Sequence, residues 1–232
     1  MNAFLPDVNR VFLRGILMET PVRALSVTGK PFTQFRLELE SKGPRSNQKN
    51  CPLVRAWGKT GEMMAEARPG ELVEVKRGLI REVSRETNEA QPKPGFICYV
   101  EAEHAEVLPP ASVNHINDIM LTGTVVHRGV LLLTKGKGIP HITLIVSVNG
   151  PKRDDLVHVP VVLWGSRAKA INEKLGERSA LMVETGKLRT RTYKQGATGE
   201  KGTTFEVVAH DIHLPTEHMS PGKPAEEEAA GE

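Results

Sequence analysis

The chain contains one pattern twice, and this duplication limits the possible folds more than any other feature. Residues 9–15 (NRVFLRG) match residues 117–123 (NDIMLTG), an offset of 108 with the same spacing from Asn to Gly. Three further anchors keep nearly the same offset: Gly29-Lys30-Pro31 with Gly138-Ile139-Pro140, Trp57-Gly58 with Trp164-Gly165, and Gly78 with Gly186. A unit of this length is too long for a solenoid repeat. The 232 residues therefore read as two copies of one small domain.

Each copy shows the same order of expected elements. Alternating or β-branched runs predict the first three strands, for example at residues 34–39 and 157–163. A helical stretch follows each Trp-Gly pair, at about residues 60–68 and 166–175. Each copy then closes with a two-stranded hairpin. Five strands with one helix between the third and the fourth give the order of the OB-fold, a small, partly open barrel.

We therefore expect an all-β fold with one short helix per domain, arranged as two tandem OB-fold barrels. The first domain spans residues 1–110, the second spans residues 111–215, and residues 216–232 form a disordered acidic tail. The second domain holds 14 Lys and Arg against 9 Asp and Glu, whereas the tail holds one Lys against five Glu. This basic excess permits a polyanionic partner but does not require one.

Several segments, in the same order in both copies, carry a resemblance to the bacterial single-stranded DNA-binding protein family. The strings that resemble its strands are residues 9–15, 28–30 with 35–37, 161–165, and 186–193 with 205–209. Two OB-folds in one chain resemble the tandem form of the family, which pairs as a homodimer to present four barrels. The resemblance implies sequence-independent binding and protection of single-stranded DNA in DNA replication, repair and recombination.

The third strand of each copy offers the first candidate contacts. Arg55 and Trp57 alternate with small apolar residues and so share an outward face, as do His158 and Trp164 in the second copy. The resemblance places a stacking aromatic side chain at Trp57 and at Trp164. The alternative is that each indole seals a barrel end against the helix.

The fourth strand of each copy offers further contacts. Arg189, Arg191 and Tyr193 alternate and therefore share a face. The resemblance gives a cationic contact to each arginine and a stacking position to Tyr193. In the first copy the matching face holds Arg81 and Arg85, where Arg85 takes the stacking position. The alternative is a solvated hairpin whose arginines serve solubility alone.

Two arginines of the first strand complete the candidate set, Arg10 and Arg14, and their counterparts in the second copy are Asp118 and Thr122. Aromatic residues make up only 4% of the chain. We therefore expect aromatic contact to be richer in the second copy, the first copy to depend on arginine, and DNA binding to be strongly sensitive to salt.

Other classes of function find less support. His210 and His213 have no third ligand at metal spacing, and no catalytic arrangement stands out, so we expect no enzymatic activity, no metal and no cofactor. Cys51 and Cys98 give no disulfide framework and no apolar run is long enough to span a bilayer, so a reducing cytosol is the expected location. The family resemblance implies that this is the bacterial cytosol.

Two alternative functions stay open. One is an OB-fold scaffold or primosome-like accessory protein that acts mainly through protein–protein contacts, and the other is RNA binding. The family recruits replication and repair proteins through an acidic tip with a terminal aromatic residue. The tail of this chain is acidic but has no aromatic residue after Phe205.

Overall fold

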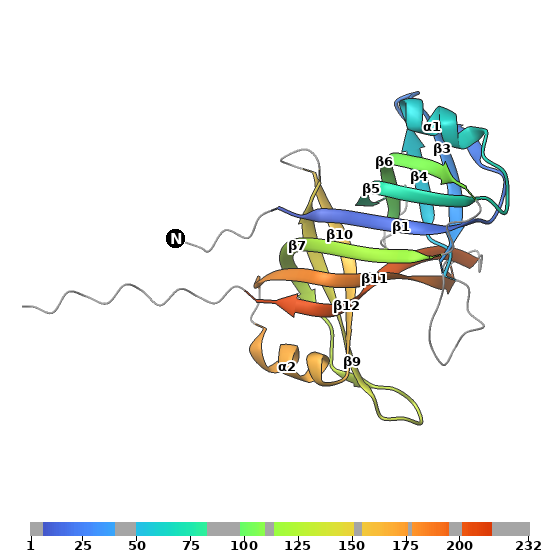
Figure 1. The fold of residues 1–232 in the computed structure, drawn as a ribbon. Helices are drawn as coiled ribbons and strands as arrows, with labels where there is room; N and C mark the ends of the chain where they lie inside the picture. Colours follow the sequence, from blue (N-terminus) through green and yellow to red (C-terminus); the bar gives the residue numbers. More distant parts are fainter. Residues whose placement is uncertain are drawn as a thin grey trace, which may run out of the picture.

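The fold is built from strands, with one short helix in each half of the chain (Figure 1). The computed structural model describes residues 7–39, 50–82, 98–109, 114–150, 155–175, 178–194 and 201–214, without the side chains of residues 193, 194, 201 and 202. The elements of the first half are β1 (Asn9–Leu17), β2 (Val22–Leu25), β3 (Pro31–Glu38), β4 (Leu53–Trp57), α1 (Gly58–Ala65), β5 (Leu72–Glu82) and β6 (Cys98–Leu108). Those of the second half are β7 (Ile116–Arg128), β8 (Leu132–Leu133), β9 (Pro140–Asn149), β10 (Leu156–Trp164), α2 (Ser166–Lys174), β11 (Ala180–Lys194) and β12 (Lys201–His213).

Each half forms an OB-fold barrel, as the order of elements predicted. In the first barrel β4 runs parallel to β6, and β3 pairs with β1 to close the barrel. The second barrel repeats this with β10 parallel to β12 and β9 paired with β7. The short strands β2 and β8, which the sequence pattern did not predict, extend the edges of β3 and β9.

The repeated glycines mark places where only a small residue or an unusual backbone angle fits. A side chain at Gly15 would place its Cβ 2.6 Å from the carbonyl oxygen of Glu38, and one at Gly123 would meet the carbonyl oxygen of Ser147 even more closely. Both contacts lie where the first strand of a barrel crosses the second long strand. The glycines therefore permit the barrels to close.

The repeated asparagines replace missing backbone contacts inside each barrel. The side chain of Asn9 donates to the carbonyl of Ile80 at 3.1 Å and accepts from its N–H at 2.8 Å. Asn117 makes the same two bonds with Leu188, at 2.9 and 2.8 Å. The side chain thus satisfies backbone groups near irregularities in the strand pairing, which explains why Asn recurs at a fixed distance from Gly.

The two barrels join through their first strands. β1 and β7 lie side by side and antiparallel in the middle of the molecule (Figure 1), with Val11 opposite Ile119. The described strands thereby form one sheet of 12 strands, in which β6-β5-β1-β7-β11-β12 are consecutive. The apolar cores of both barrels, including the fully buried Leu13, Phe35 and Phe205, belong to one continuous cluster. The barrels therefore form one packed unit.

Two of the polar contacts between the barrels form a matched pair. The N–H of Cys51 in the first barrel donates to Thr190 Oγ1 in the second at 2.9 Å. At the equivalent positions, the N–H of His158 in the second barrel donates to Glu82 Oε2 in the first at 3.1 Å. In each barrel the backbone N–H at the same position therefore donates to a side chain of the other barrel. This is the pattern of a two-fold interface between like subunits.

No helix in the described parts of the chain is long and apolar enough to cross a membrane.

Candidate nucleic-acid interface

The first barrel carries a row of aromatic rings around one guanidinium. Trp57 ends β4 and lies opposite Phe32 on β3, with ring centroids 4.9 Å apart and planes tilted by 44°. The guanidinium carbon of Arg55 lies 4.9 Å from the ring centroid of Phe32 and 4.5 Å from that of Tyr99. Trp57 and Arg55 are half-buried. Part of each side chain reaches the surface, whereas the indole Nε1 of Trp57 and the Nε of Arg55 are buried with no hydrogen-bond partner among the described residues. Such cation–π pairs hold a guanidinium flat against a ring.

Phe32 and Tyr99 are the residues that sequence reasoning missed. Both are more than nine-tenths buried, and both lie on the outward side of their strands, where Phe32 shares a face with Gln34 and Tyr99 with Glu101. Strict alternation from Phe35 would have placed Phe32 on this face. The expectation that the second repeat is richer in aromatic contact overlooked these two rings, because it did not compare β6 or the start of β3.

Arg81 lies next to this row and connects the two barrels. It lies opposite Tyr99 in the β5–β6 pairing. Its guanidinium is 3.2 Å from Glu101 and 2.6 Å from Asp155, a residue of the second barrel. Burial alone would lower the pKa of Arg81, but the hydrogen bond to Asp155 and the charge of Glu101 outweigh burial and raise it. The charge of Arg81 is therefore shared with two carboxylates of the protein.

The second barrel has a related arrangement with different partners. Trp164 ends β10 and stacks on His141 with centroids 4.8 Å apart and an interplanar angle of 19°. The guanidinium carbon of Arg189 lies 5.1 Å from the centroid of Trp164. Arg189 and Arg191 both form ion pairs with Glu206 on β12. Trp164 is half-buried and Arg191 is exposed, so this surface also presents a ring beside guanidinium groups.

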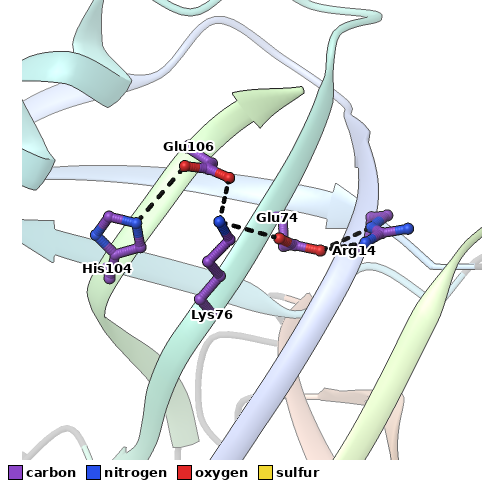
Figure 2. Close-up of polar contacts among 5 residues, drawn as sticks. All are labelled: Arg14, Glu74, Lys76, His104 and Glu106. Atoms are coloured by element: carbon purple, nitrogen blue, oxygen red, sulfur yellow. Dashed lines mark hydrogen bonds and ion pairs between the residues drawn. The ribbon is translucent and has the colours of Figure 1, made fainter. Parts of the chain in front are cut away.

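Arg14 belongs to a different cluster, on β1, β5 and β6 of the first barrel (Figure 2). It forms an ion pair with Glu74, its register partner, whose side chain is only 5% exposed. Lys76 lies 3.8 Å from Glu74 and 2.6 Å from Glu106, which in turn lies 3.6 Å from His104. From Arg14 to Glu106 opposite charges alternate along this row, so Arg14 is neutralised within the protein rather than placed beside Trp57.

The remaining candidate residues lie on the exposed surface, at the junction of the barrels, or where the structure does not describe their side chains. Arg10 is exposed and makes no ion pair with any described residue. His158 lies at the junction of the barrels, where its ring Nδ1 is 3.3 Å from Glu82 Oε2. Arg85 lies outside the described residues, and for Tyr193 the description covers only its backbone, which pairs with Gly202. Across the described ranges, no three His, Cys, Asp or Glu side chains gather as ligands for a metal.

The fold and these surfaces define a class, the tandem OB-fold proteins, in which two barrels each expose aromatic and arginine side chains. Residues 116–215 match the profile of the Single-strand binding protein family. The second barrel is thus similar in sequence to the Single-strand binding protein family. No curated protein sequence matches the chain.

Two crystal structures of the single-stranded DNA binding protein from Thermus aquaticus match nearly the whole chain. A deletion mutant of that protein matches with a TM-score of 0.71 and 22% identity, covering 94% of this chain and 98% of its own. The wild-type protein matches with a TM-score of 0.70 and 20% identity, covering 93% of this chain and 97% of its own. These likenesses extend the shared fold over both barrels.

Proposed function

We propose that the chain binds single-stranded DNA without sequence preference and protects it during replication, repair and recombination. The observation that carries the proposal is that Trp57 and Trp164 occupy equivalent ends of β4 and β10. Each indole is half-buried and belongs to a cluster that includes a guanidinium, Arg55 in the first barrel and Arg189 in the second. Aromatic faces stack bases and guanidinium groups bind phosphates, which is what a binder of unpaired strands needs. The family match supports the same function.

Within this proposal the two barrels, residues 1–110 and 111–215, are the binding domains. Arg10, Arg14, Arg55, Arg81, Arg85, Arg189 and Arg191 supply cationic contacts, and Trp57, Trp164, Tyr193 and His158 supply rings. The exposed Arg10 and Arg191 need no rearrangement to meet a phosphate, whereas Arg14 and Arg81 must exchange a carboxylate for it. The protein acts by binding and not by catalysis, in the bacterial cytosol.

The assembly we propose is a homodimer with four barrels, as the tandem form of the family implies. Light scattering across a dilution series is the test, because the proposed dimer has twice the mass of the 25.5 kDa chain. A chain mass at every concentration would contradict the homodimer and would leave DNA binding by the monomer intact.

The experiment for DNA binding is a titration of tryptophan fluorescence with oligo(dT), beside duplex DNA and RNA of the same length. We expect strong quenching by oligo(dT), because stacking on Trp57 or Trp164 changes the indole environment directly. Repeating the titration from low to high salt should give a linear fall of log K with log[salt], with a slope of about −0.7 per phosphate contact. Preference for RNA would favour the RNA-binding alternative.

The scaffold alternative makes the opposite prediction. A barrel protein that acts only through protein–protein contacts would show no saturable quenching by any of the three nucleic acids. The family profile does not favour this reading. Absence of quenching together with absence of binding in a filter assay would overturn the proposed function.

A further inference from the structure

Glu206 is the most deeply buried charged group of the candidate interface. Its side chain is 0% exposed, and removing a carboxylate from water is costly unless cations compensate for it. Its Oε1 accepts hydrogen bonds from Nε, at 2.6 Å, and from Nη2 of Arg189. Its Oε2 lies 2.7 Å from Nη1 of Arg191. One buried carboxylate therefore holds two arginines that are themselves 41% and 57% exposed.

We propose that Glu206 is a positioning residue of the single-stranded DNA surface in the second barrel, an inference that rests on the proposed function. It acts through Arg189 and Arg191 and does not itself touch DNA. By holding Nε and Nη2 of Arg189, it fixes the guanidinium plane near the ring of Trp164, at 5.1 Å from the centroid. The indole and the cation are thereby oriented before DNA binds.

The first barrel supports this proposal because it orients an arginine at the corresponding place with a different side chain. Arg81 is the repeat equivalent of Arg189, and its register partner is Tyr99, where the second barrel has Glu206. In the first barrel the ring of Tyr99 lies against Arg55. The second barrel has the buried Val162 in place of Arg55. A carboxylate on β12 thus orients arginines of β11, whereas a ring on β6 orients an arginine of β4.

The physical gain is preorganisation. A free arginine samples many rotamers, and ordering it on binding DNA costs conformational entropy. The planar guanidinium loses less freedom when a carboxylate already holds two of its N–H groups. Since the Glu206 charge offsets one of the two arginine charges, the arrangement keeps a net positive charge at the surface.

The test uses the full chain with Glu206→Gln and a matched control, Glu74→Gln. Glu74 is also a buried carboxylate that holds an arginine, Arg14, but it lies in the cluster of Figure 2, where the arginine is not stacked on Trp57 or Trp164. Both variants and the parent with which they are compared carry Trp57→Phe, so that quenching reports on Trp164. Measurements are made at a temperature where circular dichroism shows both variants to be folded.

We expect Glu206→Gln to weaken oligo(dT) binding by about fivefold to twentyfold and to change the emission of Trp164, while Glu74→Gln, which releases Arg14 from its carboxylate, does not weaken binding. Equal losses in both variants would overturn the proposal, because loss of a buried charge pair in general would then explain them. An unchanged affinity of Glu206→Gln would overturn it too. If the parent fails to bind oligo(dT), the proposed function fails instead.

Two further variants separate positioning from charge. Glu206→Asp keeps the charge but shortens the side chain, so positioning predicts weakened binding, whereas affinity equal to the parent contradicts it. Adding Arg189→Gln to Glu206→Gln should cost less than about a further twofold, because Arg189 has already lost its orientation. A large further loss would mean that Arg189 binds DNA without help from Glu206, and the proposal would be wrong.

Discussion

Val11 on β1 lies directly opposite Ile119 on β7, and Ile119 is the residue that replaces Val11 in the second repeat. A residue that faces its own equivalent marks a local two-fold axis, so the barrels associate as two subunits of a symmetric dimer would. The paired contacts of Cys51 with Thr190 and of His158 with Glu82 follow the same symmetry. The junction also leaves neither first strand as an exposed sheet edge.

Barrel closure depends on Gly123. We expect Gly123→Ala to lower the free energy of unfolding by about 1–3 kcal/mol, because the added methyl meets the carbonyl oxygen of Ser147 on β9. The matched control is Gly136→Asn, at an exposed turn with φ of 85° and no atom near its Cβ, where Asn is tolerated. Urea unfolding measures both. Equal stabilities of the two variants would show that β7 and β9 can separate without cost.

Arg14 compensates the buried charge of Glu74. Removing Arg14 should therefore lower the stability of the protein more than removing Lys76. We expect Arg14→Ala to destabilise the protein by about 2 kcal/mol or more, because Glu74 is left buried with Lys76, at 3.8 Å, as its remaining ion-pair partner in the described part of the chain. Lys76→Ala leaves the Arg14–Glu74 pair intact and should cost clearly less stability than Arg14→Ala. Thermal unfolding distinguishes the two, and the reverse order would contradict the burial argument.

The same cluster predicts a pH dependence. Lys76, chiefly by its hydrogen bond, and His104 hold the pKa of Glu106 below its ordinary value of 4.5. A carboxyl whose pKa is lower in the folded state contributes stability above its unfolded pKa and loses it as the pH falls through the folded value. Glu106→Gln should therefore be less stable than the parent at pH 7, and the difference should vanish once the pH falls below the folded-state pKa of Glu106. A difference that persists there would exclude ionic stabilisation.

The two cysteines should react at very different rates. Burial, with the charge of Glu82, raises the pKa of Cys98 to about 12, whereas Cys51 is only partly buried. At pH 8 about one Cys98 in ten thousand is a thiolate, the reactive form. A thiol reagent should label one site per folded chain quickly and the second only after unfolding. Cys51→Ser should abolish the fast phase; its survival would assign the fast phase to Cys98.

Both tryptophans should contribute to DNA affinity. We expect Trp57→Ala and Trp164→Ala each to weaken oligo(dT) binding by about 1–3 kcal/mol, the usual contribution of one stacked base. Val27→Ala is the control, since this side chain is 97% exposed and apolar. Filter binding at fixed salt provides the measurement. If neither variant differs from the control, the indoles are structural and do not contact DNA.

The sequence predicts the features that depend on neighbouring residues better than those that depend on contacts between distant segments of the chain. The order of strands and helices was predictable, because alternation, β-branched runs and the Trp-Gly turns are local signals. The outward faces of Trp57, Trp164, Arg189 and Arg191 were predictable for the same reason, since side chains alternate along a strand. Tyr99 was accessible to that rule as well, but β6 was not included in the comparison of faces.

The partners of those side chains were not predictable. Whether Arg189 meets Glu206 or Arg81 meets Asp155 depends on which strands pair and in which register. A shift of one residue in register would turn each of these side chains to the other face. Composition alone, with 31 cations and 28 anions, could not show that most of the candidate arginines already have a carboxylate beside them.

The sequence by itself thus determined the duplication, the barrel class and the residues that face outward, because spacing along the chain encodes local conformation. Only the tertiary structure decided that Val11 meets Ile119 across the junction, that Phe32 and Tyr99 enclose Arg55, and that Glu206 holds two arginines. These relationships join segments far apart in the chain, and long-range packing and strand register fix them.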